Sequence, residues 1–236
     1  MEIMNCAEAA QLYLRCIKII MAKRSTRASA VTVPDKPTLP SLRAAAAGCK
    51  ACHLWKLGTQ TVFGEGSATA RVMMVGEQPG DKEDLQGRPF VGPAGAVLDK
   101  ALAAAGIDRH QDVYLTNIVK HFKWEPRGKR RLHKKPNALD ISACRPWLDA
   151  EINVIKPQVV VLLGATAAQG ILGNQFRVTK QRGQWLESKI APLVMATVHP
   201  SSILRAPDDD SRHEEMRKFV ADLKKVAAQL QQRRAA

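Results

Sequence analysis

Short apolar segments alternate with longer helix-like stretches along most of the chain. Four short runs rich in β-branched and other apolar residues predict buried strands, at residues 71–75, 113–116, 158–163 and 193–197. Apolar residues recur at helical spacing over residues 94–105, 138–155, 165–172 and 211–230. Such alternation is typical of parallel strands connected by helices on both faces of a sheet. The pattern therefore predicts a three-layer α/β/α domain around a mostly parallel four-stranded sheet.

Two further segments carry weaker patterns. Residues 178–186, with Gly183 inside them, predict a hairpin at the edge of the sheet. Residues 2–22 have loosely helical apolar spacing, and residues 23–41 are polar and contain proline. We therefore expect an N-terminal extension and linker over residues 1–41 and the α/β domain over residues 42–236.

Composition adds a strong positive charge to an otherwise ordinary globular protein. The 236 residues are 45% hydrophobic and 25% charged, and 36 Lys and Arg against 22 Asp and Glu give a net charge of +14. This charge favours a polyanionic partner, and nucleic acid is favoured over membrane because no long apolar span exists. A generally basic soluble protein is the alternative. The absence of a secretory signal and the odd number of cysteines predict a cytoplasmic protein with reduced thiols.

Polar residues follow all four predicted strands. The first strand is followed by GEQPGD (residues 76–81), the second by Asn117, the third by Gly164 and the fourth by His199. In such folds ligands bind outside the carboxyl ends of the strands. Each residue alone also fits a turn or a helix cap, but their joint placement predicts one shared site.

The segment KRRLHKKP, residues 129–136, places His133 among five cations and lacks the periodicity of a helix or strand. Surrounding positive charge is expected to lower the pKa of His133 and favour its neutral, nucleophilic form. The same cations attract a phosphate backbone. A solvated basic loop is the alternative when the segment is considered alone.

Three cysteines suggest a metal site. Cys49 and Cys52 form a CxxC pair, and Cys144 can supply a third thiolate. On spacing alone, zinc is favoured over an iron-sulfur group.

Several motifs resemble the family-four uracil-DNA glycosylases from about residue 48 to the carboxyl terminus. They are GEQPGDKED (76–84), GRPFVGPAG (87–95), TNIVKHF (116–122), VVLLGATAA (160–168) and TVHPSSILR (197–205). GEQPG together with the KRRLHKKP loop resembles the UdgX subgroup, whose members bind uracil-containing DNA and become covalently joined to it through the loop histidine. Leu132 stands where isoleucine is commoner in that loop, an exchange of similar volume that we expect to be tolerated.

The resemblance implies a uracil-DNA glycosylase-like fold and a [4Fe-4S] cluster held by Cys49, Cys52, His121 and Cys144. Most family-four members carry a fourth cysteine where this chain has His121, and this departure also occurs in the UdgX subgroup. Imidazole also ligates iron in Rieske centres. A zinc site with the same four ligands stays open as the alternative.

The resemblance also implies roles for the strand-end residues. Phe90 stacks on the flipped base, Asn117 pairs with the polar edge of uracil, and His199 donates to uracil O2. The backbone of residues 78–81 lines the pocket, so Gln78 and Asp81 are assigned to substrate binding. Glu77 orients His133 and stabilises the developing cation. Arg131 holds the loop by pairing with a pocket acid or with phosphate. The expected DNA contacts are Lys129, Arg130, Lys134 and Lys135.

Three functions follow as hypotheses. The first is a glycosylase that excises uracil from DNA, including single-stranded DNA, and traps itself on the sugar through His133. The second is a multiple-turnover uracil-DNA glycosylase in which water attacks and His133 only grips DNA. The third is a noncatalytic nucleic-acid-binding or metal-sensing module. A monomer is expected because neither the basic face nor the resemblance requires a second subunit.

Overall fold

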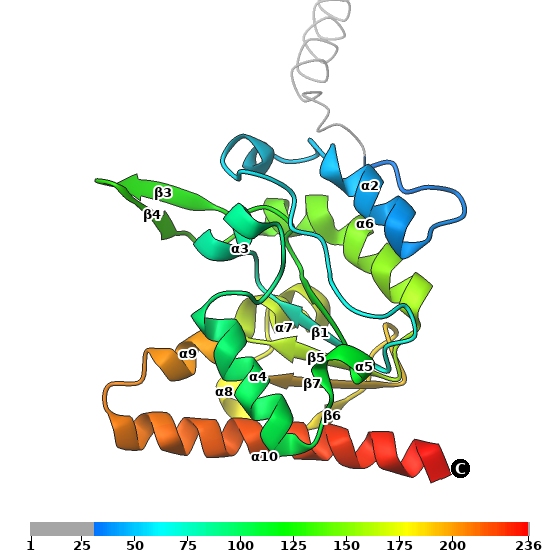
Figure 1. Cartoon of the computed structure of the whole chain (residues 1–236), viewed down its shortest axis with the longest axis vertical. Coiled ribbons are helices and arrows are strands. Elements are labelled where there is room, and N and C mark those ends of the chain that lie inside the picture. Colours follow the sequence, from blue (N-terminus) through cyan, green and yellow to red (C-terminus); the bar gives the residue numbers. More distant parts are fainter. Residues whose placement is uncertain (1–30, 236) are drawn as a thin grey trace, which may run out of the picture. The chain divides into compact units, whose positions relative to one another are not determined.

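A five-stranded sheet lies at the centre of the computed structural model, which describes residues 31–235 (Figure 1). The strand order is β2-β1-β5-β7-β6. Four strands are parallel, namely β1 (Val72–Gly76), β2 (Val113–Asn117), β5 (Val159–Leu163) and β7 (Leu193–Thr197). The α/β prediction is confirmed, with one strand more than the four expected. The additional strand β6 (Trp185–Leu186) pairs antiparallel with β7 and is too short to leave a period-two pattern.

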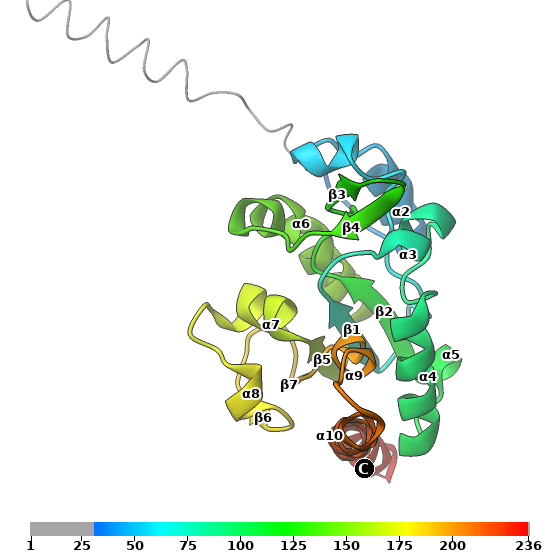
Figure 2. The same ribbon diagram turned by 90° about the vertical axis from the view of Figure 1, so that its left-hand side faces the viewer.

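Successive residues of each parallel strand supply two separate cores. In β1, Met73 and Val75 belong to one cluster, and Val72 and Met74 to the other. The first cluster packs against α6 (Ala138–Ile155) and α7 (Ala165–Leu172). The second packs against α4 (Pro93–Ala105), α9 (Pro200–Leu204) and α10 (Asp209–Ala235), so helices cover both faces of the sheet (Figure 2). The strands are mostly apolar because they are buried on both sides, and β2 carries its polar residues, Thr116 and Asn117, at its carboxyl end.

All four predicted long helices are confirmed, and the short elements were missed because each is too short for periodicity to reveal. The missed helices are η1 (His53–Lys56), α3 (Asp81–Gln86), α5 (Arg109–Asp112), α8 (Val178–Gln181) and α9. The nine-residue α2 (Leu39–Ala47) was also missed, because its first residues follow the polar, proline-containing stretch assigned to the linker. The hairpin predicted over residues 178–186 is wrong, since its first half is α8 and only its end, β6, is a strand. Among the described residues, no helix is both long and apolar enough to cross a membrane.

The N-terminal segment is described only in part. The helix expected over residues 2–22 and the linker up to residue 30 lie outside the described residues. Residues 39–41, assigned to the linker, belong to α2, which begins with a Thr38 capping box and a proline in its first turn. Leu39 is buried in the first cluster, the one that packs against α6 and α7. This part of the predicted linker is therefore ordered against the domain.

A two-stranded hairpin stands apart from the sheet (Figure 1). It is formed by β3 (Trp124–Arg127) and β4 (Arg130–His133), with Trp124 opposite His133. Gly128 adopts a φ of 58° at the turn, a conformation that glycine accepts without strain. The KRRLHKKP segment was expected to be a basic loop, but its residues 130–133 form the strand β4. Charged residues obscured the strand because both hairpin faces are largely solvated.

Candidate active site

A pocket of about 730 Å³ opens at the carboxyl ends of the parallel strands. The chain runs from β1 to β2 on one side of β1 and then crosses to β5 on its other side. Doubly wound sheets bind ligands at the strand ends where the chain changes direction in this way. The shared site predicted from the strand ends is present as a pocket. The predicted site residues that line it are Glu77, Gln78, Phe90, Asn117, His133, Lys135 and His199.

Phe90 and Asn117 meet beside the end of β1. A Cβ atom at position 76 would collide with Asn117 Oδ1 and lie 2.8 Å from Phe90 Cζ, so Gly76 is required for their close approach. Phe90 is only 4% exposed and has a φ of 56°, which is strained for a bulky residue. Its ring is stacked with that of His199, with centroids 6.0 Å apart and an interplanar angle of 28°. These contacts place a flat apolar surface next to an amide.

His199 is held neutral with one defined ring nitrogen left for a ligand. Its Nδ1 accepts the backbone N–H of Ser201 at 3.2 Å and thereby caps α9. Burial, together with the smaller effect of the charges of Arg205 and His133, lowers the pKa of His199 to about 4. An imidazole that accepts at Nδ1 and is neutral carries its proton on Nε2. His199 can therefore donate from Nε2 into the pocket.

His133 and Glu77 face each other across the pocket wall. Nε2 of His133 lies 3.3 Å from Oε1 of Glu77, and half of the histidine side chain is exposed. Burial lowers the pKa of His133, the Glu77 carboxylate opposes this shift, and Arg205 adds to it. The predicted direction is confirmed, but burial is the largest cause and the cation responsible is Arg205 rather than the neighbouring loop residues. His133 is therefore mainly neutral at neutral pH.

Arg131 fastens the hairpin to α3. Its Nε contacts Asp81 Oδ1 at 2.6 Å, and its Nη1 contacts the buried Asp84 Oδ2 at 2.6 Å. The guanidinium also lies over the rings of Phe122 and Trp124, at 5.3 and 5.6 Å from the centroids. The sequence assigned Asp81 and Arg131 to substrate binding. In the structure they pair with each other, and neither residue lines the pocket. Pairing of Arg131 with an acid was one of its two expected roles.

The side chain of Gln78 joins the two ends of the same hairpin. Its Nε2 donates to the carbonyl oxygens of Lys123 at 3.1 Å and Lys134 at 3.0 Å, and its Oε1 accepts from Lys123 N at 3.2 Å. Gln78 is 6% exposed. Its amide is therefore occupied in placing His133, although the residue also lines the pocket.

The basic residues of the hairpin occupy different environments. Lys129 and Arg130 are exposed at its tip. Lys134 pairs with Glu125 at 2.8 Å, and Lys135 lines the pocket. Only the first two are thus fully free to meet a distant phosphate backbone, while Lys135 is placed to act close to the site.

Two charged pocket residues were missed from the sequence. Arg205 lines the pocket at the end of α9 and depresses the pKa of both His133 and His199. Glu83 is buried, and burial raises its pKa although it accepts backbone N–H groups from Gly80, Gly92 and Phe90. Its position three residues after Gly80, typical of a capping box, was a signal for this role.

A buried ion pair supports the pocket from behind. Lys120 Nζ lies 2.6 Å from Glu151 Oε2 and donates to the carbonyl oxygen of Asn117 at 2.9 Å. Both side chains are at most 1% exposed. Glu151 Oε1 also accepts from the hydroxyl of Tyr114 at 2.9 Å. The pair links α6 to the backbone of a residue that lines the pocket.

We expect Glu151→Gln to lower the free energy of unfolding by about 3–5 kcal/mol, because it leaves the buried Lys120 ammonium without its counter-charge. Urea unfolding measures the loss. Glu125→Gln is the matched control: its pair with Lys134 is half-exposed on both sides, and we expect a loss below about 1 kcal/mol. Equal losses in the two variants would contradict a special role of the buried pair.

Of the four predicted metal ligands, Cys52 interacts with both His121 and Cys144, and Cys49 lies three residues before Cys52. Hydrogen bonding to Cys144 and, to a smaller extent, to His121 lowers the pKa of Cys52 to about 4, although burial opposes its ionisation. Cys144 Sγ accepts from Lys120 N at 3.4 Å, and Cys49 Sγ accepts from Trp147 Nε1 at 3.3 Å. No three His, Cys, Asp or Glu side chains of the described segment are grouped closely enough to hold a single metal ion.

His121 supplies a further sign of a ligand site. The hydroxyl of Thr61 donates to Ala46 O at 2.9 Å, so it accepts the Nε2 proton of His121 at 2.9 Å. This leaves the lone pair on Nδ1, a buried atom without a hydrogen-bond partner. A histidine that ligates a metal usually donates its other ring N–H to an oxygen, which fixes the orientation of the ring. The residues present therefore fit a sulfur-rich metal group.

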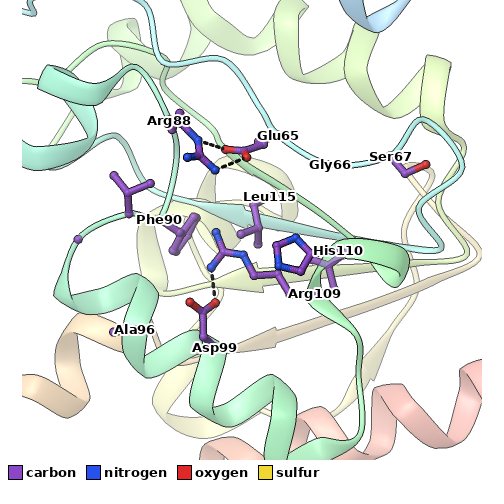
Figure 3. A pocket seen from close by; sticks show the side chains of 13 residues that line it. Glu65, Gly66, Ser67, Arg88, Phe90, Ala96, Asp99, Arg109, His110 and Leu115 are labelled. Carbon is purple, nitrogen blue, oxygen red and sulfur yellow. Dashed lines mark hydrogen bonds and ion pairs between the residues drawn. The ribbon is translucent and has the colours of Figure 1, made fainter.

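A second pocket, of about 710 Å³, also has Phe90 in its wall (Figure 3). Its two arginines are already paired with carboxylates in the same wall. Arg88 forms a bidentate pair with Glu65, with Nη2 2.6 Å from Oε1, and Arg109 pairs with Asp99. These carboxylates make the second pocket a poor site for a polyanion.

Comparison with known proteins identifies the family. Residues 63–224 match the family model of the uracil DNA glycosylase superfamily. The type-4 uracil-DNA glycosylase of Thermotoga maritima is 40% identical over 178 residues, which cover 74% of this chain and 84% of that protein. The type-4 uracil-DNA glycosylase of Sulfurisphaera tokodaii is 37% identical over 179 residues, which cover 72% and 78% of the two chains. The chain belongs to the uracil DNA glycosylase superfamily.

Proposed function

We propose that this protein excises uracil from DNA and becomes covalently joined to the remaining sugar through His133. The observation that carries the proposal is the 3.3 Å approach of His133 Nε2 to Glu77 Oε1 at the edge of the pocket. A neutral imidazole beside a carboxylate is the arrangement of an activated nucleophile. Family membership supports the excision of uracil, and the histidine hairpin supports the covalent step.

The pocket offers separate groups for each part of a flipped uracil. The ring of Phe90 provides a stacking surface. The Asn117 amide oxygen can accept from uracil N3–H while its nitrogen donates to O4, a pattern that cytosine reverses. His199 Nε2 donates to O2, where negative charge develops as the glycosidic bond breaks. Because this imidazole is neutral, it polarises the base without transferring a full charge into the pocket.

The proposed covalent step exchanges one bond at C1′ for another. The bond from C1′ to uracil N1 breaks, and uracil leaves as an anion stabilised by His199. The sugar becomes oxocarbenium-like, and the Glu77 carboxylate stabilises its positive charge. One ring nitrogen of His133 bonds to C1′ with its lone pair, and the resulting imidazolium releases its N–H proton to Glu77 or solvent. The product is an N-substituted imidazole that blocks further cycles.

The hairpin explains why histidine rather than water would attack. Gln78 connects both ends of the hairpin by hydrogen bonds, and Arg131 connects strand β4 to Asp81 and Asp84. These contacts restrict His133 to the rim of the pocket before DNA binds. An attacking group held in place has a large advantage over a free water molecule.

A denaturing gel of the protein mixed with uracil-containing single-stranded DNA tests the proposal. We expect a band of protein joined to DNA and a one-to-one amount of free uracil, with the protein acting as a monomer. Release of many uracil molecules per protein without an adduct would instead assign a multiple-turnover uracil-DNA glycosylase. DNA containing thymine at the same position is the control and should give neither product.

We further propose that Cys49, Cys52, His121 and Cys144 hold a [4Fe-4S] cluster. Thiolates with one imidazole can ligate cluster iron. The cluster would join residues 49–52 to α6 and has a structural role, since glycosidic cleavage transfers no electron.

We expect purified protein to be brown and to contain iron and sulfide. His121→Cys should keep the visible absorbance because thiolate also ligates iron, whereas Cys144→Ser should lose it. Elemental analysis measures both outcomes. Zinc in place of iron in the unaltered protein would contradict the cluster.

A further inference from the structure

A groove of about 670 Å³ continues from the active-site pocket along α6 and α7. Lys135 and Thr166 line both cavities, so the two are contiguous. Polar groups from both helices and the following loop line the groove, among them Asn137, Ser142, Gln169 and Asn174. A strand whose nucleotide occupies the pocket must continue away from it, and this groove offers a path.

The charge of the groove suits a phosphate backbone. Lys135 and Arg145 contribute two cations, and no Asp or Glu is among the described lining residues. Arg145 Nε contacts Asp149, which lies outside the lining, and its Nη1 donates to Gly170 O at 3.3 Å. The second pocket, in Figure 3, differs because Glu65 and Asp99 lie in its wall beside their arginines. A polyanion is therefore favoured in the groove over the second pocket.

The remaining surface of the groove suits nucleobases. Pro136, Ile141 and Pro146 supply apolar contacts between the amide and hydroxyl groups. Leu139 stands beside the groove-lining Ala138 in the first turn of α6 and is 79% exposed. Single-stranded nucleic acid is usually bound by a positively charged groove with flat side chains against which the bases pack. The groove supplies the cations and aliphatic rather than aromatic contacts for the bases.

We propose that this groove binds the nucleotides that adjoin the flipped uracil on one side of the same strand. The proposal rests on the proposed function, because it requires a uracil nucleotide in the neighbouring pocket. According to this proposal, the DNA strand runs along α6 and α7 and does not enter the second pocket, which contains Arg88 and Arg109. Contacts in the groove then depend on nucleotides on one side of the uracil only.

Binding of a 2′-fluoro-deoxyuridine oligonucleotide by fluorescence anisotropy separates this proposal from the chemistry. The electronegative substituent opposes oxocarbenium formation, so binding is measured without excision. Three probes are compared, with flanking nucleotides on both sides, only on the 5′ side and only on the 3′ side. Ser142→Glu adds an exposed negative charge within the groove, and Ala228→Glu adds one at an exposed position of α10 on the opposite face of the sheet.

We expect Ser142→Glu to weaken the two-sided probe about five- to tenfold, through repulsion of a nearby phosphate. It should weaken one of the one-sided probes equally and leave the other unchanged, while Ala228→Glu changes none. Arg145→Gln should lower the slope of log affinity against log salt by about 0.7 for the sensitive probes. Lys224→Gln on α10 is its control and should leave the slope unchanged.

The outcomes separate the two proposals. If Ser142→Glu lowers the affinity for all three probes equally, or for none of them, the proposal that the groove binds nucleotides on one side of the uracil is rejected. Either result would reject it even with normal excision of uracil. Preference of the unaltered protein for the fluorinated uracil probe over a thymine probe establishes that the pocket is in use. Tight, uracil-dependent binding without excision from ordinary uracil DNA would reject the proposed chemistry and leave the groove proposal intact.

Discussion

His133→Ser is expected to abolish the covalent adduct while uracil release continues. The substitution removes the only imidazole placed by the hairpin against Glu77, but it leaves Asn117, His199 and Phe90 around the base. Water can then enter the vacated space and attack C1′. A denaturing gel should show no joined band, and free uracil should exceed the amount of protein.

The control for this variant is His213→Ser, which replaces an exposed histidine of α10 and should leave the adduct unchanged. Peptide mapping of the unaltered protein should place the sugar on the peptide that contains His133. An adduct on Lys134 would replace the imidazole mechanism with Schiff-base chemistry. A joined band from His133→Ser protein would likewise show that another nucleophile reacts.

Glu77→Gln is expected to slow both uracil release and adduct formation by about 10²–10⁴-fold, as for the loss of a general base or a transition-state charge partner. The effect should not come from the protonation of His133. Burial already lowers the pKa of that histidine, and removing the carboxylate that opposes the shift would lower it further. The variant therefore has at least as much neutral imidazole, and its loss of rate reports the missing charge at the sugar.

Single-turnover rates of uracil release across pH 5–8 measure the effect, because this range covers the ordinary pKa of histidine. Glu125→Gln, on the same hairpin, is the control with an exposed carboxylate and should keep the normal rate. A Glu77→Gln protein whose rate is restored by raising the pH would show that the carboxylate acts only through the protonation state of His133. An unchanged rate would remove Glu77 from the mechanism.

The sequence by itself determined the layers of the fold and the side of the sheet that carries the site. Strands β1, β2, β5 and β7 are buried on both faces, so their residues form continuous apolar runs that local composition reveals. Polar residues directly after such runs must meet at one edge when the strands are parallel. Glu77, Asn117 and His199 were located by this reasoning, and the motif resemblance supplied the roles expected of them.

Only the tertiary structure decided how the histidine is held and tuned. The strand β4 escaped detection because its charged residues are largely solvated, and because its anchors on Gln78 and α3 are contacts with separate segments of the chain. The pKa of His133 depends on burial and on Arg205, which reaches the pocket from α9. Likewise, the Lys120 and Glu151 pair forms only when α6 packs behind β2. Periodicity records which face of an element is buried, whereas desolvation and ion pairing depend on distances between elements, which only the folded chain defines.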